Sequence, residues 1–101
     1  MDSTDLIAEL EKQLKALGLP TNPHDIIGQL FRFECKLYTE SHILIGRILG
    51  IDFRPGTLRL QVSNTTVGLF TLIAIYYEGG KWASFIKAYR HGFHEGKFQL
   101  L

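Results

Sequence analysis

The sequence has a single cysteine, no long apolar run and an acidic start, and each feature excludes a class of protein. Cys35 cannot form an internal disulfide, and small secreted domains usually carry paired cysteines, so we expect a reducing compartment, the cytoplasm. The first residues are acidic where a signal peptide would be basic, so we expect no export. The most hydrophobic stretch, 67–77, is well below the roughly 18 residues of a membrane-spanning helix, so we expect no membrane association.

Charge of one sign is also lacking. The 11 Lys and Arg residues against 10 Asp and Glu residues give a net charge of +1, so the field around the protein is weak and does not by itself predict a nucleic-acid partner. The sequence also contains no nucleophile elbow, no complete phosphate-binding loop and no dinucleotide fingerprint. We therefore predict no catalytic residue and no cofactor, and we favour a binding protein over an enzyme.

Length and composition predict one folded domain, residues 1–101. Hydrophobic residues make up 46% and charged residues 21% of the chain, which is the ordinary globular range. The pattern of polar and apolar residues predicts the α+β class: an N-terminal helix, a four-stranded antiparallel meander in a strongly curved sheet, a C-terminal helix packed on the sheet, and a short C-terminal tail or edge strand.

Two segments have the spacing of amphipathic helices. In the first, aliphatic residues recur at helical spacing from Leu6 to Leu17, and Gly18 with Leu19 forms a typical helix ending. The second begins near residue 81, and its apolar side chains stand three and four positions apart: Trp82, Phe85, Ile86 and Tyr89. A glycine followed by an apolar residue, Gly92 and Phe93, repeats the ending of the first helix.

The region between these helices predicts four strands. Residues 31–38 and 43–53 alternate with period two, and Gly46 and Gly50 in the second segment indicate a bend, a bulge or close approach of another backbone. Residues 54–57, Arg-Pro-Gly-Thr, fit a type II turn that leads into a strand at 58–63. The last strand, 67–77, is apolar on both faces, so we expect it to be central, with a helix covering one face.

Basic residues on and beside the predicted sheet form one candidate interface. They are Arg32, Lys36, Arg47, Arg54 and Arg59, and on a shared face they would follow a phosphate backbone. Gly79 and Gly80 before Lys81 similarly place free backbone N–H groups and an ammonium where an anion would bind. The simpler interpretations are solvated surface charges and a tight turn, and we favour them in both cases.

Histidine and cysteine residues raise the question of a metal site. His91 and His94 lie close together beside Glu95, but zinc prefers four ligands. The distant donors that would complete such a shell stand in no known ligand spacing: His24, Cys35 and His42. We therefore predict no metal site. Histidines near a helix end also suit the helix dipole, and the role of these two stays open.

Aromatic residues make up 12% of this short chain and its tail is apolar, which is more than a small core needs. We therefore predict a surface that binds a partner. Its candidate residues are Trp82, Tyr89, Phe98 and Leu100. The predicted function is that of a small non-enzymatic binding or adaptor protein, which contacts a protein partner and forms a homodimer.

Two alternatives stay open at this point. The first is a nucleic-acid-binding module that uses the basic sheet face, and it is not favoured. The second is a protein that binds a small ligand in a pocket under the last helix. A deep cavity ringed by a few polar and aromatic side chains would indicate the second alternative: His24, Tyr38, His42 or Tyr77.

Overall fold

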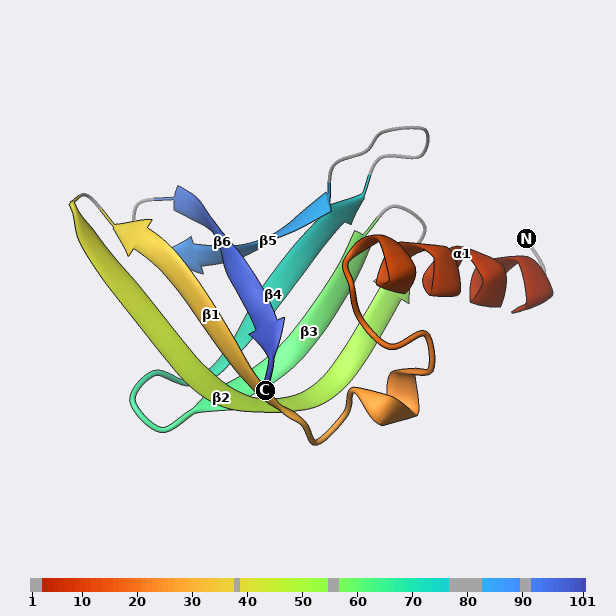
Figure 1. Cartoon of the computed structure of the whole chain (residues 1–101), viewed down its shortest axis with the longest axis horizontal. Coiled ribbons are helices and arrows are strands. Elements are labelled where there is room, and N and C mark those ends of the chain that lie inside the picture. Colours follow the sequence, from red (N-terminus) through yellow and green to blue (C-terminus); the bar gives the residue numbers. More distant parts are fainter. Residues whose placement is uncertain (1–2, 38, 55–56, 77–82, 90–91) are drawn as a thin grey trace.

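The chain folds as a closed antiparallel β-barrel preceded by one α-helix (Figure 1). The structure is a computed structural model and describes residues 3–37, 39–54, 57–76, 83–89 and 92–101. The helix is α1 (Ser3–Ala16), and a short 3-10 helix follows at Pro23–Asp25. The strands are β1 (Leu30–Leu37), β2 (Glu40–Arg54), β3 (Thr57–Asn64), β4 (Gly68–Tyr76), β5 (Ala83–Tyr89) and β6 (Gly92–Leu100).

Each strand pairs with the next, and β6 returns to pair with β1, which closes the barrel. The predicted α+β class is therefore wrong: six strands replace the four-stranded meander, and no C-terminal helix is found among the described residues. The segment predicted as the second helix is β5, and the predicted tail is part of β6. None of the described helices is long and apolar enough to cross a membrane.

The second helix was predicted wrongly because a lysine hides the alternation of β5. Phe85 and Lys87 are both buried, whereas Ile86 between them is partly exposed, so this segment has the period of a strand. In the sequence, Lys87 reads as a solvent-facing residue, and only the helical spacing remains apparent. Pairing with β4 on one side and β6 on the other satisfies backbone groups that an open sheet would leave unpaired.

The long strand β2 changes phase at a β-bulge between Ile48 and Gly50. We expected its apolar residues on one face, but Ile43, Ile45 and Leu49 point outward and are about half exposed. Ile51, beyond the bulge, packs against the core. One extra residue reverses the inward and outward sides of a strand, so the bulge that the glycines predicted is confirmed while the predicted facing is wrong.

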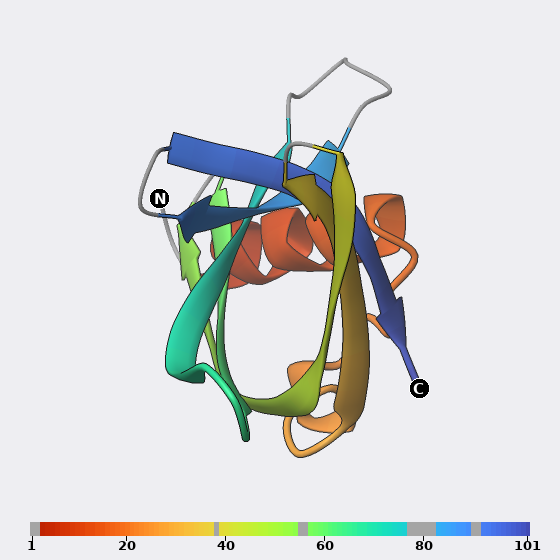
Figure 2. The ribbon, with the colours of Figure 1, turned by 90° about the vertical axis from the view of Figure 1, so that its left-hand side faces the viewer.

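The first helix is confirmed, including the way it ends. Gly18 has a φ of 75°, the Leu19 N–H donates to the Leu14 carbonyl at 2.9 Å, and the Gly18 N–H donates to the Lys15 carbonyl at 3.1 Å. This is the Schellman pattern, in which the residue after glycine folds back on the helix. Leu14 and Leu19 are buried in the barrel core, and α1 lies across the far end of the barrel in Figure 2.

The barrel is narrow, so side chains fill its interior. Phe31 and Phe33 of β1 are fully buried, and the ring of each lies against a glycine on a neighbouring strand. Gly46 lies opposite Phe31, and a Cβ there would overlap the Ser63 carbonyl oxygen. A Cβ at Gly96 would lie 2.5 Å from the Phe33 ring. The predicted close approach of another backbone at Gly46 is thus confirmed, and the two glycines make room for the aromatic core.

Candidate functional site

The basic residues predicted as a nucleic-acid interface are spread around the barrel. Arg32 of β1 pairs with Glu34 at 2.9 Å, and both side chains are about one-third exposed. On β3, Arg59 stands opposite Asp52 of β2. Arg54 lines a small hollow of about 230 Å³ together with these two residues. Each of these places therefore combines arginine with an acid.

The two other basic residues on the strands lie elsewhere. Lys36 is exposed near the end of β1. Arg47 projects from the outside of β2, and its Nη1 donates to the Gly28 carbonyl at 2.5 Å. Since the sheet curves into a barrel, these residues form no continuous basic strip, which a nucleic-acid backbone would need. The candidate anion site at Gly79, Gly80 and Lys81 falls outside the described residues.

The residues predicted to bind a partner are placed only in part. Trp82 lies outside the described residues, and so does the side chain of Tyr89 on β5. Phe98 and Leu100 of β6 are half-buried and pack against the core, because they follow the inward alternation of that strand. Phe98 lies between Phe31 and Phe85, with ring centroids 5.7 Å and 4.4 Å away. These two side chains therefore leave only part of their surface exposed, and Phe98 lines a hollow on the side of β6 nearest α1.

The histidines do not come together with other metal ligands. His24 is exposed in the 3-10 helix, His42 lies in β2, and His94 lies in β6. Among the residues that the structure describes, no group of three or more His, Cys, Asp or Glu side chains could hold a metal ion. His91, Tyr38 and Tyr77 fall outside the description, so the ring of residues expected around a ligand cavity is not seen as a whole.

A buried lysine is the feature that the sequence failed to predict. Lys87 is 6% exposed, and its Nζ lies 4.8 Å from the centre of the Phe70 ring, a distance at which a cation is attracted to the ring face. It stands opposite His94 on β6. Burial lowers the pKa of Lys87, because the charged form loses its hydration, and an interaction with the buried Cys35 offsets part of this effect. The signal in the sequence was the period of two at Phe85 and Lys87.

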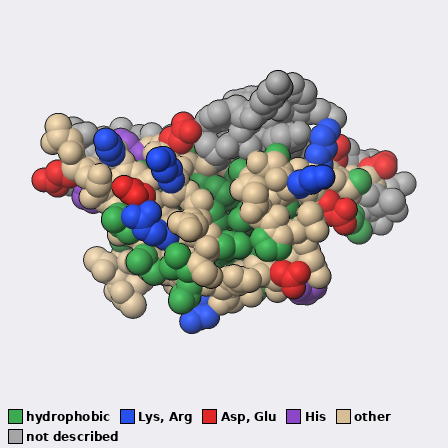
Figure 3. All heavy atoms as spheres, viewed as in Figure 1, with side chains coloured by type: hydrophobic (Ala, Val, Ile, Leu, Met, Phe, Trp, Pro, Cys, Tyr) green, Lys and Arg blue, Asp and Glu red, His purple; other side chains and the backbone are tan. Residues whose placement is uncertain are grey.

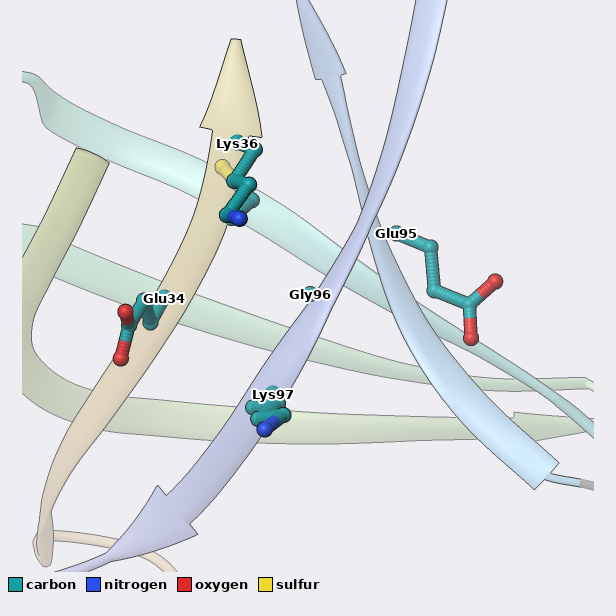
Figure 4. A pocket seen from close by; sticks show the side chains of 6 residues that line it. Glu34, Lys36, Glu95, Gly96 and Lys97 are labelled. Atoms are coloured by element: carbon teal, nitrogen blue, oxygen red, sulfur yellow. The ribbon is translucent and has the colours of Figure 1, made fainter. Parts of the chain in front are cut away.

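A pocket of about 480 Å³ follows the seam between β1 and β6 (Figure 4). It lies where the pairing of the two strands ends, at Cys35 and Gly96. Its other lining residues alternate in charge: Glu34, Lys36, Glu95 and Lys97. In Figure 4 the Glu95 side chain extends away from β1. Two acids balance two lysines, so this pocket has no preference for a ligand of either charge.

An apolar surface covers the outside of β1, β2 and β4, and we call it the outer apolar face. Its six members are large aliphatic residues that are each at least two-fifths exposed: Leu30, Ile43, Ile45, Leu49, Val67 and Leu69. Leu69 is 77% exposed, so the predicted cover over both faces of the fourth strand is absent at this position. Figure 3 shows hydrophobic side chains gathered at the lower left, where β1 and β2 run in Figure 1.

The strand register places Leu30 close to the aliphatic residues of β2 and separates it from Leu69 by two polar positions. Leu30 stands opposite Arg47, Arg47 opposite Ser63, and Ser63 opposite Leu69, which gives one row across four strands. Ile45 precedes Arg47 by two positions on the same side of β2. It is therefore the diagonal neighbour of Leu30, and diagonal neighbours lie within side-chain reach of each other.

No protein-family model matches the chain, and neither the curated proteins nor the solved structures contain a significant match.

Proposed function

We propose that the chain is a protein-binding module that self-associates through the outer apolar face, with two copies packed face to face about a twofold axis. The observation that carries this proposal is the exposure of six large aliphatic side chains on one side of the barrel, on β1, on β2 and at the start of β4. Exposed apolar groups with polar residues among and around them often mark a protein-protein interaction site. The proposal keeps the protein-binding role expected from the sequence and moves it from the C-terminal segment to the outer surface of the barrel.

The size of the face sets the strength of the contact. From Leu30 to Leu69 it spans three strand spacings, about 14 Å, and from Ile43 to Leu49 along β2 it spans about 20 Å. A standard interface covers about 800 Å² on each partner. The outer apolar face is therefore the apolar centre of a contact whose rim is polar.

The expected affinity follows from the exposed area. The six exposed fractions together amount to about three whole aliphatic side chains, and full burial of one such side chain contributes about 1.5–3 kcal/mol. In a twofold contact both copies lose this exposure, which doubles the gain, and association costs about 4–15 kcal/mol in lost freedom of motion, which offsets much of it. With some support from the rim, we expect a weak homodimer with a dissociation constant between about 1 µM and 1 mM.

Charge favours a second copy of the chain as the occupant. The net charge of +1 gives little repulsion between copies. On the rim, Arg32 stands opposite Ile45 and Glu34 stands opposite Ile43, so a twofold axis brings the arginine of one copy toward the glutamate of the other. Arg47 lies within the face and is held by the Gly28 carbonyl. Arginine is enriched at protein interfaces, where its side chain packs against the partner and also forms hydrogen bonds.

Sedimentation velocity between about 10 µM and about 1 mM tests the proposal. The variant Ile45→Thr with Leu69→Thr keeps residues that suit a strand, and should weaken the dimer by more than about tenfold because it removes apolar area worth over 1.4 kcal/mol. Arg59→Thr is the matched control, since Arg59 is exposed on β3 outside the face. The control should leave dimerisation unchanged, and thermal unfolding should confirm that both variants fold.

A monomer at every concentration would overturn the proposal. So would a dimer that the Ile45→Thr and Leu69→Thr substitutions leave intact while Arg59→Thr weakens it. In that case the contact lies elsewhere on the barrel, and the outer apolar face is not the interface.

A further inference from the structure

A second hollow lies between the C-terminal end of α1 and the strand β6, apart from the outer apolar face. Its volume is about 480 Å³, which is within the range of about 300–1,000 Å³ typical of sites for small organic ligands. Leu17 forms the wall on the α1 side, and Phe85 and Phe98 form the apolar floor. Figure 3 shows hydrophobic side chains in the region between β6 and α1.

The floor is rigid and aromatic. The ring centroids of Phe85 and Phe98 lie 4.4 Å apart, and Phe31 stacks on the other side of Phe98 at 5.7 Å with its ring 12° from parallel. Gly96 stands opposite Phe85 and also lines the hollow, and the space that a side chain at this position would need is filled by the Phe33 ring, which adds a further aromatic side chain behind the floor. A flat or extended apolar group would find a preformed surface here, at little cost in side-chain ordering.

The rim donates hydrogen bonds and carries positive charge. Among the residues that the structure describes, the polar side chains lining the hollow are Arg32, Lys97 and Gln99, and none of the lining residues in these ranges is a carboxylate. Arg32 already binds a carboxylate, that of Glu34, at 2.9 Å. An ion pair this exposed contributes about 0.2–1 kcal/mol, so a carboxylate from a ligand can share or replace it. The seam pocket shares Gly96 and Lys97 with this hollow but is also lined by Glu34 and Glu95, so its charges are balanced and it lacks this preference.

A buried amide lies on the same side of α1. Gln13 is one helical turn before Leu17 and is 1% exposed. Its side-chain nitrogen is buried and has no hydrogen-bond partner among the residues that the structure describes. A buried donor of this kind is destabilising unless it meets an acceptor. Gln13 itself does not line the hollow, so the proposal below does not use this amide.

We propose that this hollow binds a small carboxylic acid with an aromatic or aliphatic tail. The tail packs on Phe85, Phe98 and Leu17, and the carboxylate lies at the rim between Lys97 and Arg32. The aromatic floor and the cationic rim match the two ends of such a molecule. None of the described lining residues is one of the six aliphatic members of the outer apolar face, although Arg32 also lies on the rim of that face, so the two proposals are tested with different variants.

The test is a titration of the full chain with 4-phenylbutyrate, with octanoate as an aliphatic acid and 4-phenylbutanol as the uncharged counterpart. Amide NMR spectra locate the binding site and give the dissociation constants. We expect saturable shifts at Leu17, Gly96 and Phe98, and an affinity for the acid about five- to tenfold higher than for the alcohol, because charge-assisted bonds to the carboxylate are the stronger ones.

Two lysine variants separate the site from general attraction to a basic surface. Lys97→Gln removes an exposed charge at the rim. It should lower the affinity for the acid by about fivefold and leave the affinity for the alcohol unchanged. Lys36→Gln removes an exposed charge on β1 that does not line the hollow, and it should leave the affinity for both ligands unchanged. The absence of saturable shifts at the hollow with both acids, equal binding of acid and alcohol, or equal effects of the two variants would each overturn the proposal.

Discussion

Replacement of Gly46 by alanine is the sharpest test of the barrel. Gly46 lies on β2, and the carbonyl of Ser63 on β3 occupies the space that a side chain would need. Ser63 pairs with Arg47, the next residue of β2. Because the obstacle is backbone, relief of the overlap requires the two strands to move apart. A methyl group at this position therefore acts against the curvature that closes the barrel.

The magnitude follows from opposing effects. Overpacking of a filled interior costs about 1–3 kcal/mol, and the overlap with backbone puts Gly46→Ala at the upper end of that range. Reduced flexibility of the unfolded chain returns up to about 1 kcal/mol. We expect a net loss of about 2 kcal/mol or more in the free energy of unfolding. In a domain of this size, that lowers the melting temperature by about 10–20 °C.

The matched control is Gly50→Ala on the same strand. A Cβ at Gly50 meets the Gln61 side-chain oxygen at 3.1 Å, and that flexible, exposed side chain can move. We expect a change within about 1 kcal/mol. Urea unfolding followed by circular dichroism measures both variants. Equal stability of the two alanine variants would refute the reasoning, because β2 and β3 would then not approach as closely at Gly46 as the closed barrel requires.

Two further substitutions test the interior. Lys87→Met should stabilise the protein most at neutral pH, where burial of the charged lysine destabilises the parent. Because burial lowers the pKa of Lys87 from its ordinary value of 10.5, the parent should gain stability as the pH rises through the lowered pKa toward 10.5. If urea unfolding gives the same stability difference between variant and parent at every pH, this reasoning is wrong. Gln13→Leu should raise the free energy of unfolding by about 1–3 kcal/mol, since it removes a buried amide nitrogen with no partner among the described residues; a loss of stability would show that the amide is bonded.

The elements that local sequence determines were predicted well. The first helix and its ending depend on leucine spacing and on Gly18, whose positive φ suits glycine. The bulge in β2 was indicated by glycine inside an alternating segment. These features are governed by neighbours along the chain, and therefore a single sequence contains the information that predicts them.

The closure of the barrel was not predictable in this way. It depends on β6 pairing with β1, across more than sixty positions of the chain, and no local pattern reports such a contact. The segment of β5 fits both a helix and a strand, and the pairing with β4 and β6 selects the strand. The same contacts place Lys87 inside the barrel and Phe98, predicted to contact a partner, in its wall.

The closed barrel also explains why apolar side chains remain outside. A narrow barrel has room for few large side chains, and Phe31 and Phe33 of β1 already occupy much of it. The bulge in β2 then directs Ile45 and Leu49 to the outer surface, where polar residues would serve a monomer equally well. These exposed side chains do not stabilise a single copy, whereas in the proposed dimer the second copy would shield them from water. The hollow beside α1 contains none of these aliphatic residues and shares only the rim residue Arg32 among its described lining, so we expect a dimer formed through the outer apolar face to leave its apolar floor open to a ligand.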